Sequence, residues 1–247
     1  MSNYIIKPKG IRKDHWPIVK QSISLMGKGI STRVELFKML GISSGRSSNL
    51  LVSLTREELV ETDVINLVGH LRIGLIRLTN KGKEYAQTFC GFNFNQDDTY
   101  SEWGHLLNVH QGADQTRHTA TTLYFAYFAR LCGWQVEIAP KTSTYGFDPD
   151  LVLTAGNTRI FFEVEMTERG FKGKNDKWHR KWARQRHEQH HIAVCTLTPK
   201  RKERYRKLCQ ANNWRGYLTD ITTLRKQANA GELNGLNDLF EIVDPKK

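Results

Sequence analysis

The stretch DPDLVLTAGNTRIFFEVEM, residues 148–166, decides the fold of the second half of the chain. It contains two runs of β-branched and aromatic residues joined by Gly156-Asn157, a pair that favours a tight turn between antiparallel strands. Residues two apart on a strand point to the same face, so Glu163 and Glu165 should project together, and the hairpin can bring Asp150 alongside one of them. The stretch therefore predicts a β-hairpin that gathers three acids.

These acids have the chemistry of a metal site. They lie beside apolar residues, and burying a carboxylate charge costs several kcal/mol unless something compensates it. Carboxylate oxygens suit Mg²⁺ or Mn²⁺, hard ions that keep waters and phosphate oxygens as their other ligands. We therefore expect Asp150, Glu163 and Glu165 to bind the metal. Asp148 is an alternative to Asp150 but lies further from the strand, and strand-end acids that are simply solvated are the competing interpretation.

The hairpin belongs to a regular series of elements. Apolar residues at helical spacing predict a helix from Thr116 until Gly133 ends it. Further runs predict strands over 134–140, 150–155 and 158–166, a charged helix over about 174–188, a buried strand at 191–198, a helix over 200–211 and a strand at 215–220. The order is helix, three strands, helix, strand, helix, strand.

The pair Pro149-Asp150 followed by Glu163-Val164-Glu165 on such a hairpin resembles the PD-(D/E)xK nuclease superfamily, over about residues 114–225. The resemblance implies an α/β domain with an αβββαβ core. It also implies that Asp150 and Glu163 bind the metal and that a lysine polarises the attacking water. A metal ion in such a site stabilises charge on the phosphate and lowers the pKa of bound water.

The sequence departs from this pattern at the third position, where Glu165 replaces the lysine. Some restriction enzymes of the superfamily have glutamate there, and in others a neighbouring element supplies the lysine. Lys172, Lys174 or Lys177 could reach the site, and Lys174 is our candidate for the catalytic cation. A shifted register, with Glu165 as metal ligand and Thr167 at the third position, is the alternative.

A basic stretch follows the acids. Residues 168–207 contain fourteen Lys and Arg against four Asp and Glu. On a helix, Lys174, Lys177, Lys181 and Arg184 share one stripe, where a phosphate backbone could lie beside the acids. The neighbouring Trp178 and Trp182 are more typical of a helix face packed on a core. His187, His190 and His191 lack a Cys or acid at ligand spacing, so a zinc site is the weaker interpretation.

The first half of the chain predicts three short helices and a hairpin. Apolar spacing indicates a helix over 16–26, a second after a cap at Ser31 or Thr32, and, after the turn GISSGR, a third over 47–59 with a polar outer face. Two short helices joined by a glycine turn suit a helix-turn-helix. Short β-prone runs at 64–68 and 72–78 then flank Gly69-His70.

The stretch LTNKGKEYA, residues 78–86, resembles the end of the wing in winged helix-turn-helix DNA-binding domains, with Thr79 as the N-cap of a final helix. The resemblance covers about residues 12–88 and implies an α+β domain whose third helix enters the major groove. The residues that it assigns to DNA contact are Arg46, Asn49 and Arg56 on that helix, with Arg72 and Lys81 on or near the wing. A winged helix used only for protein contacts is the alternative.

Composition limits the class of protein. Lys and Arg number 37 against 25 Asp and Glu, a formal charge of +12 that favours an anionic partner such as nucleic acid. No apolar run is long enough to span a membrane, and the first residues lack the features of a secretion signal. The four cysteines form no CxxC pair, so we expect a reducing cytoplasm rather than a disulfide framework.

Together these patterns predict a winged-helix domain over 1–88, a linker over 89–113 whose aromatic residues pack on a surface, and a nuclease-like domain over 114–247. The combination resembles the plasmid replication-relaxation family, which implies a plasmid or other mobile element. We expect a Mg²⁺- or Mn²⁺-dependent endonuclease or nickase that acts on double-stranded DNA. A second copy of the chain, or a recombination or replication protein, is a further candidate partner. The rival is a non-catalytic DNA-binding replication or mobilisation factor; an RNA-binding protein ranks lower because RNP-type and KH-like signatures are absent.

Overall fold

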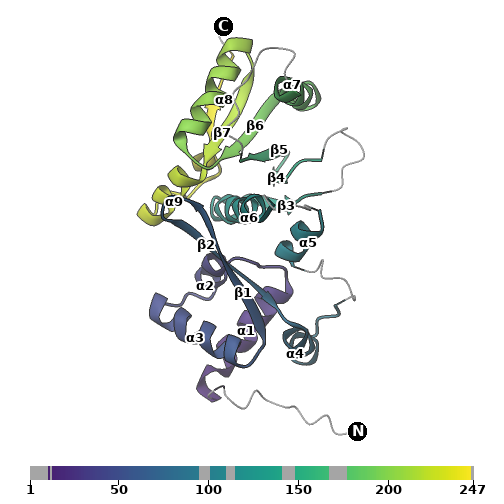
Figure 1. Ribbon diagram of the computed structural model, residues 1–247, viewed down its shortest axis with the longest axis vertical. Coiled ribbons are helices and arrows are strands. Elements are labelled where there is room, and N and C mark those ends of the chain that lie inside the picture. Colours follow the sequence, from purple (N-terminus) through teal and green to yellow (C-terminus); the bar gives the residue numbers. More distant parts are fainter. Residues whose placement is uncertain are drawn as a thin grey trace. The chain divides into compact units, whose positions relative to one another are not determined.

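The computed structural model describes residues 11, 13–94, 101–109, 115–140, 148–166 and 177–245. The chain is a mixed α/β protein, with N-terminal helices and a β-hairpin followed by a six-stranded mixed sheet with interleaved helices (Figure 1). It divides into two compact units at residues 111 and 112, with the hairpin tip 66–71 grouped with the second unit.

The first unit consists of helices around one two-stranded hairpin. Its elements are the 3₁₀ turn η1 (Lys13–His15), α1 (Trp16–Gly27), α2 (Arg33–Met39), α3 (Ser44–Arg56), β1 (Val60–Val68), β2 (Leu71–Leu78), α4 (Asn80–Cys90) and α5 (Glu102–Val109). Their apolar faces meet in one core that includes fully buried Ile23, Leu36 and Leu54, one residue from each of α1, α2 and α3. The predicted three helices and hairpin are therefore confirmed.

Helix boundaries follow from local capping. The hydroxyl of Thr32 accepts a hydrogen bond from the Glu35 amide at 3.4 Å, so Thr32, rather than Ser31, caps α2. Helix α3 begins three residues earlier than predicted, because its extended N-cap is Ser43 and the stretch expected as a turn already forms its first helical turn. That turn is polar and exposed, so apolar periodicity could not detect it.

The motif at the end of the hairpin has a specific packing role. Thr79 caps α4, as predicted, by accepting a hydrogen bond from the Gly82 amide at 3.1 Å. Its own amide donates to the Leu59 carbonyl at 3.1 Å, and its hydroxyl donates to the Glu58 carbonyl. A Cβ atom at position 82 would collide with the Leu59 carbonyl oxygen. The glycine is thus the residue that allows α4 to lie against the chain before β1.

Helix α5 lies inside the stretch expected as a linker. Its first residues bond to the loop after α1: the Glu102 amide donates to the Gly29 carbonyl at 3.1 Å, and the Trp103 amide donates to the Ser31 hydroxyl at 3.0 Å. The Trp103 ring is buried, and the Arg77 guanidinium lies 5.0 Å from its centroid. This part of the stretch packs on the first unit, as its aromatic residues indicated.

The second unit has the predicted order of elements, extended at its end. It comprises α6 (Gln115–Leu131), β3 (Gln135–Ile138), β4 (Leu151–Ala155), β5 (Thr158–Glu165), α7 (Lys177–Gln189), β6 (His191–Thr196), α8 (Pro199–Asn212), β7 (Arg215–Asp220), α9 (Ile221–Ala230), the 3₁₀ turn η3 (Leu236–Leu239) and β8 (Glu241–Val243). The strands follow the order β3-β4-β5-β6-β7-β8. Pairing is antiparallel from β3 to β5, parallel from β5 to β7, and antiparallel for β8.

Two helical layers cover the sheet. Phe125 of α6 packs against Phe162 of β5, with ring centroids 5.0 Å apart. Trp182 of α7 is fully buried against Tyr205 of α8, in a core formed with β6 and β7. Since neighbouring residues on a strand face opposite ways, Glu163 lies on the face opposite Phe162, toward α7. None of the helices described is long and apolar enough to cross a membrane.

Candidate functional site

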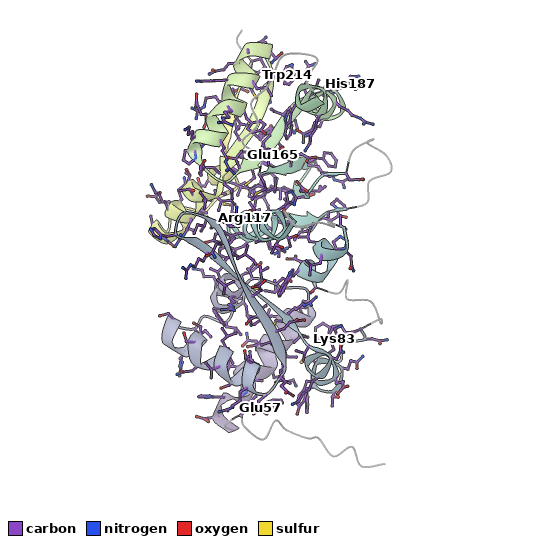
Figure 2. All side chains as sticks on the ribbon, in the orientation of Figure 1. Glu57, Lys83, Arg117, Glu165, His187 and Trp214 are labelled. Carbon is purple, nitrogen blue, oxygen red and sulfur yellow. The ribbon has the colours of Figure 1, made fainter. Side chains whose placement is uncertain are left out.

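The three predicted acids lie together inside the second unit. Asp150, Glu163 and Glu165 are respectively 7%, 6% and 4% exposed (Figure 2, where Glu165 is labelled). Asp150 immediately precedes β4, whose first residue pairs with Phe162 of β5, so the hairpin places it beside Glu163. Asp148, the alternative ligand, is exposed. We call Asp150, Glu163 and Glu165 the acid cluster.

Asp150 is fixed by two partners. One carboxylate oxygen, Oδ2, accepts a hydrogen bond from the Val164 amide at 2.7 Å and lies 3.2 Å from Nε2 of His118 in α6. The same ring nitrogen is 3.1 Å from the Val164 carbonyl oxygen. Burial opposes the ionisation of Asp150, but the hydrogen bond and charge of His118 outweigh it and hold the pKa of Asp150 below its ordinary value. Burial likewise opposes charge on His118, yet Asp150 raises the pKa of His118 above its ordinary value.

Glu163 forms an ion pair with a lysine from the next helix. Lys181 Nζ of α7 lies 2.8 Å from Glu163 Oε2. Burial raises the pKa of Glu163 to about 7 in spite of this partner, and the negative charges of Asp150 and Glu165 add to the rise. Burial disfavours the Lys181 ammonium, but Glu163 outweighs that effect, so the pKa of Lys181 is raised.

Helix α7 is attached to β5 by a row of polar side chains. Gln185 donates to the Phe161 carbonyl at 3.1 Å and accepts from the Ala193 amide at 3.2 Å, which joins β5 to β6 where the two strands diverge. Gln189 bonds to both the amide and the carbonyl of Phe161, each at 3.1 Å. Lys181, Gln185 and Gln189 are spaced by four residues and lie on one helix face. These hydrogen bonds fix the position at which Lys181 reaches Glu163.

Helix α8 supplies groups at the end of β5. Tyr205 is buried, and this burial is the main reason why the pKa of its hydroxyl is raised. The negative charges of Glu165 and Glu163 raise it further. Arg201 donates to the carbonyl of Met166, the residue after β5, at 2.9 Å. The acid cluster is thus enclosed by α6, α7 and α8.

Sequence reasoning missed two of these residues and did not pair a third, Lys181, with an acid. His118 lies on an apolar helix more than thirty residues before the hairpin, and Gln185 is not a charged residue. The structure pairs Lys181 with Glu163, and its contact with DNA stays a prediction. The four-residue spacing of Lys181, Gln185 and Gln189 was the available signal. Lys172, Lys174 and Thr167 lie outside the described residues, and of Lys177 only the backbone is described.

Six of the residues predicted to contact DNA are exposed on their elements. Those of the first unit are Arg46, Asn49 and Arg56 on α3, Arg72 on β2 and Lys81 on α4; Arg184 is exposed on α7. Arg46 and Asn49 line a hollow between α3 and the start of α1. Two of these cations lie near acids, Arg56 at 3.8 Å from Glu57 and Lys81 at 3.6 Å from Glu58.

Part of the basic stretch stabilises the fold. On α8, Lys202 lies 3.2 Å from the buried carboxylate of Asp220 and 3.7 Å from Glu241, and Arg206 pairs with Glu241 and Glu203. These ion pairs attach the edge strand β8 to α8. Lys202 and Arg206, which lie outside the stripe predicted to contact DNA, are therefore engaged within the fold.

The donor set suits a hard cation, but its arrangement does not form a cage. All three members of the acid cluster offer carboxylate oxygens, the ligands that Mg²⁺ and Mn²⁺ prefer. Among the described residues, however, no group of three or more His, Cys, Asp or Glu is placed to hold a metal ion. His118 contacts one oxygen of Asp150, and Lys181 contacts one oxygen of Glu163.

No family model, characterised protein or solved structure with which we compared the chain matches it.

The raised pKa of Glu163 predicts a pH-dependent effect on stability. Its folded-state value of about 7 exceeds the ordinary 4.5, so the folded state binds this proton more tightly. The resulting stabilisation is complete below the unfolded pKa and is lost as the pH rises through the folded pKa. Glu163→Gln cannot lose a proton, so its free energy of unfolding relative to wild type should improve by on the order of 2 kcal/mol between pH 4.5 and pH 8.

Thermal unfolding in chelator at these two pH values measures this difference. Glu137→Gln, at an exposed position on β3, is the control and should show no comparable change. If the free energies of unfolding of Glu163→Gln and wild type differed by the same amount at both pH values, the raised pKa of Glu163 would be contradicted.

Proposed function

We propose that the chain is a DNA-binding protein whose second unit hydrolyses phosphodiester bonds with the help of a divalent cation. The observation that carries the proposal is the acid cluster on one hairpin with Lys181 against it. Burying three carboxylates costs free energy of folding. Buried acids with a strongly perturbed pKa, such as Glu163, are typical of functional sites. The antiparallel hairpin followed by parallel strands and flanking helices supports a PD-(D/E)xK-like arrangement.

In this proposal Asp150, Glu163 and Glu165 would hold Mg²⁺ or Mn²⁺, which when bound would stabilise charge on the phosphate and activate water. The chain's own groups have separate tasks. His118 orients Asp150 through the hydrogen bond to Oδ2. Lys181, whose side chain is 39% exposed, presents a positive charge at the rim, where the phosphate would lie. Lys174 remains a candidate for the same task from its place in the sequence.

The first unit would bind the duplex as a winged helix-turn-helix. Helix α3 exposes Arg46, Asn49 and Arg56 on one side while Leu50 and Leu54 pack inward, which is the division that a groove-binding helix needs. The hairpin β1–β2 would act as the wing, with exposed Arg72 near phosphate. The formal charge of +12 agrees with a polyanionic partner.

One observation favours a second candidate, a non-catalytic DNA-binding factor of a plasmid or other mobile element. Asp150 and Glu163 are already bonded within the protein, and the described residues contain no assembled metal cage. A nuclease-like fold that had lost its activity could use such internal ion pairs to neutralise its remaining acids.

Incubation of the protein with supercoiled plasmid DNA and a series of divalent cations separates the two candidates. Nicked or linear product with Mg²⁺ or Mn²⁺, absent in chelator, supports the nuclease. Plasmid that stays supercoiled under conditions where a mobility shift shows binding would establish the non-catalytic factor instead.

Alanine at Arg46 or Asn49 should weaken binding to a preferred duplex about tenfold, because each side chain can bond to a base edge. Arg72→Ala should reduce affinity for all sequences alike and make the salt dependence shallower. Fluorescence anisotropy over a range of salt concentrations measures both effects. Lys20→Ala, at an exposed position on α1, is the control and should bind like wild type. Equal affinities for the α3 variants and this control would exclude α3 as the binding helix.

A further inference from the structure

The outer side of α8 carries cations at helical spacing. The large apolar side chains of the helix are buried, namely Tyr205, Leu208 and Cys209. Lys207 follows Tyr205 by two positions, which in an α-helix is nearly the opposite side, and Lys200 lies two turns before it. Both lysines are exposed, and Arg204 lies between them and is half-buried. These three residues therefore form a cationic row on the side of α8 that faces away from the sheet.

Helix α7 extends this surface. The two helices cover the same face of the sheet and pack on each other through Trp182 and Tyr205, whose ring centroids are 5.2 Å apart. Arg180 and Arg184 stand two positions before and two positions after Trp182, so they lie on the outer side of α7, and both are exposed. We call Arg180, Arg184, Lys200, Arg204 and Lys207 the outer cations.

The outer cations do not favour the helices that carry them. Like charges repel at a spacing of four residues, as between Arg180 and Arg184 or between Lys200 and Arg204. The first turn of α8 contains no Asp or Glu, and Lys200 stands there at the positive end of the helix dipole. The other cations of α8 differ in this respect, because Lys202 lies 3.2 Å from Asp220. An anion outside the fold would relieve the repulsion among the outer cations.

We propose that the outer cations form a second DNA-binding surface, which contacts the phosphate backbone of a duplex whatever its sequence and is separate from α3. The inference rests on the proposed function for its partner, double-stranded DNA, but it requires no metal ion. Ammonium and guanidinium groups on a solvent-facing row suit phosphate, and each phosphate contact releases counterions. An anionic membrane fits less well, because a helix that lies in a membrane interface exposes apolar side chains and those of α8 are buried.

Paired substitutions measure the contribution of each row. Lys200→Gln with Lys207→Gln removes two charges from α8, and Arg180→Gln with Arg184→Gln removes two from α7. Arg225→Gln with Lys226→Gln is the matched control, since it removes two exposed charges from α9, which contacts α6 instead. Fluorescence anisotropy with several duplexes of unrelated sequence gives the affinity of each protein over a range of salt concentrations.

The α7 and α8 double variants should bind every duplex about tenfold more weakly than wild type, with the order of preference among duplexes unchanged. The slope of log affinity against log salt concentration should become shallower by about one to two, because fewer counterions are released. The α9 control should bind like wild type. Thermal unfolding should show no loss of stability in any variant, since the substitutions remove like-charge repulsion at the surface and glutamine suits a helix.

Three results would overturn the second surface. Salt slopes of the α7 and α8 variants equal to that of the α9 control would do so, and duplex binding by wild type would then still support the proposed function. Absence of duplex binding by wild type would refute both proposals. If the α7 and α8 variants lost binding to phosphatidylserine vesicles but bound duplexes like wild type, the outer cations would belong to a membrane contact.

Discussion

Asp150→Asn should reduce metal-dependent cleavage of plasmid DNA on the order of a thousandfold, while DNA affinity stays close to wild type. Asparagine has the shape of aspartate, and its amide oxygen can still accept the hydrogen bond from the Val164 amide that Asp150 Oδ2 accepts at 2.7 Å. What it removes is one full negative charge of the acid cluster, and hence a ligand that a hard cation needs.

Initial rates of nicking or linearisation, measured beside fluorescence anisotropy and thermal unfolding, test this prediction. Asp148→Asn is the matched control, since it removes an exposed acid two residues away and should cleave like wild type. Cleavage by Asp150→Asn at the wild-type rate would exclude the acid cluster as the catalytic centre. A loss of DNA affinity equal to the loss of rate would instead indicate that Asp150 acts in binding.

Gly82→Ala should destabilise the first unit by about 3 kcal/mol, the upper part of the range for overpacking a well-packed core. The added methyl group would collide with the backbone carbonyl oxygen of Leu59, which cannot move aside as a flexible side chain would. That carbonyl also accepts the Thr79 amide at 3.1 Å, so displacing it disturbs the cap of α4 as well.

Chemical denaturation followed by circular dichroism measures the change in the free energy of unfolding. Gly91→Ala provides a contrast at the other end of α4, where a Cβ meets no neighbour and the cost comes only from the positive φ of 73°. Destabilisation at Gly82 no larger than at Gly91 would show that the backbone near Leu59 yields easily. The second unit should unfold as in wild type in both variants.

Local patterns allowed most of the architecture to be predicted. Gly156-Asn157 between two β-prone runs indicated the hairpin, and Thr79 before a glycine indicated the start of α4, because both features act over a few residues. The same reasoning placed Asp150, Glu163 and Glu165 together, since one hairpin carries all three.

The surroundings of these acids depend on contacts that no local pattern specifies. His118 reaches Asp150 only because α6 packs across the sheet, and Lys181 reaches Glu163 only because two glutamines fix α7 on β5. Charge patterning placed Lys181 on a basic stripe but could not show which way the stripe faces. The short strand β8 was missed because three residues carry too little periodicity to detect.

The glutamine contacts of α7 have a consequence for how the protein opens. The members of the acid cluster all come from the hairpin of β4 and β5. Such a hairpin forms through contacts between residues that are close in sequence. The balancing ammonium depends on a separate helix, α7, which two amide side chains join to that hairpin and buried Trp182 joins to α8 and β6. Partial detachment of this helix would uncover the carboxylates while leaving the strands paired, so slow amide exchange in β4 and β5 should coexist with faster exchange in α7.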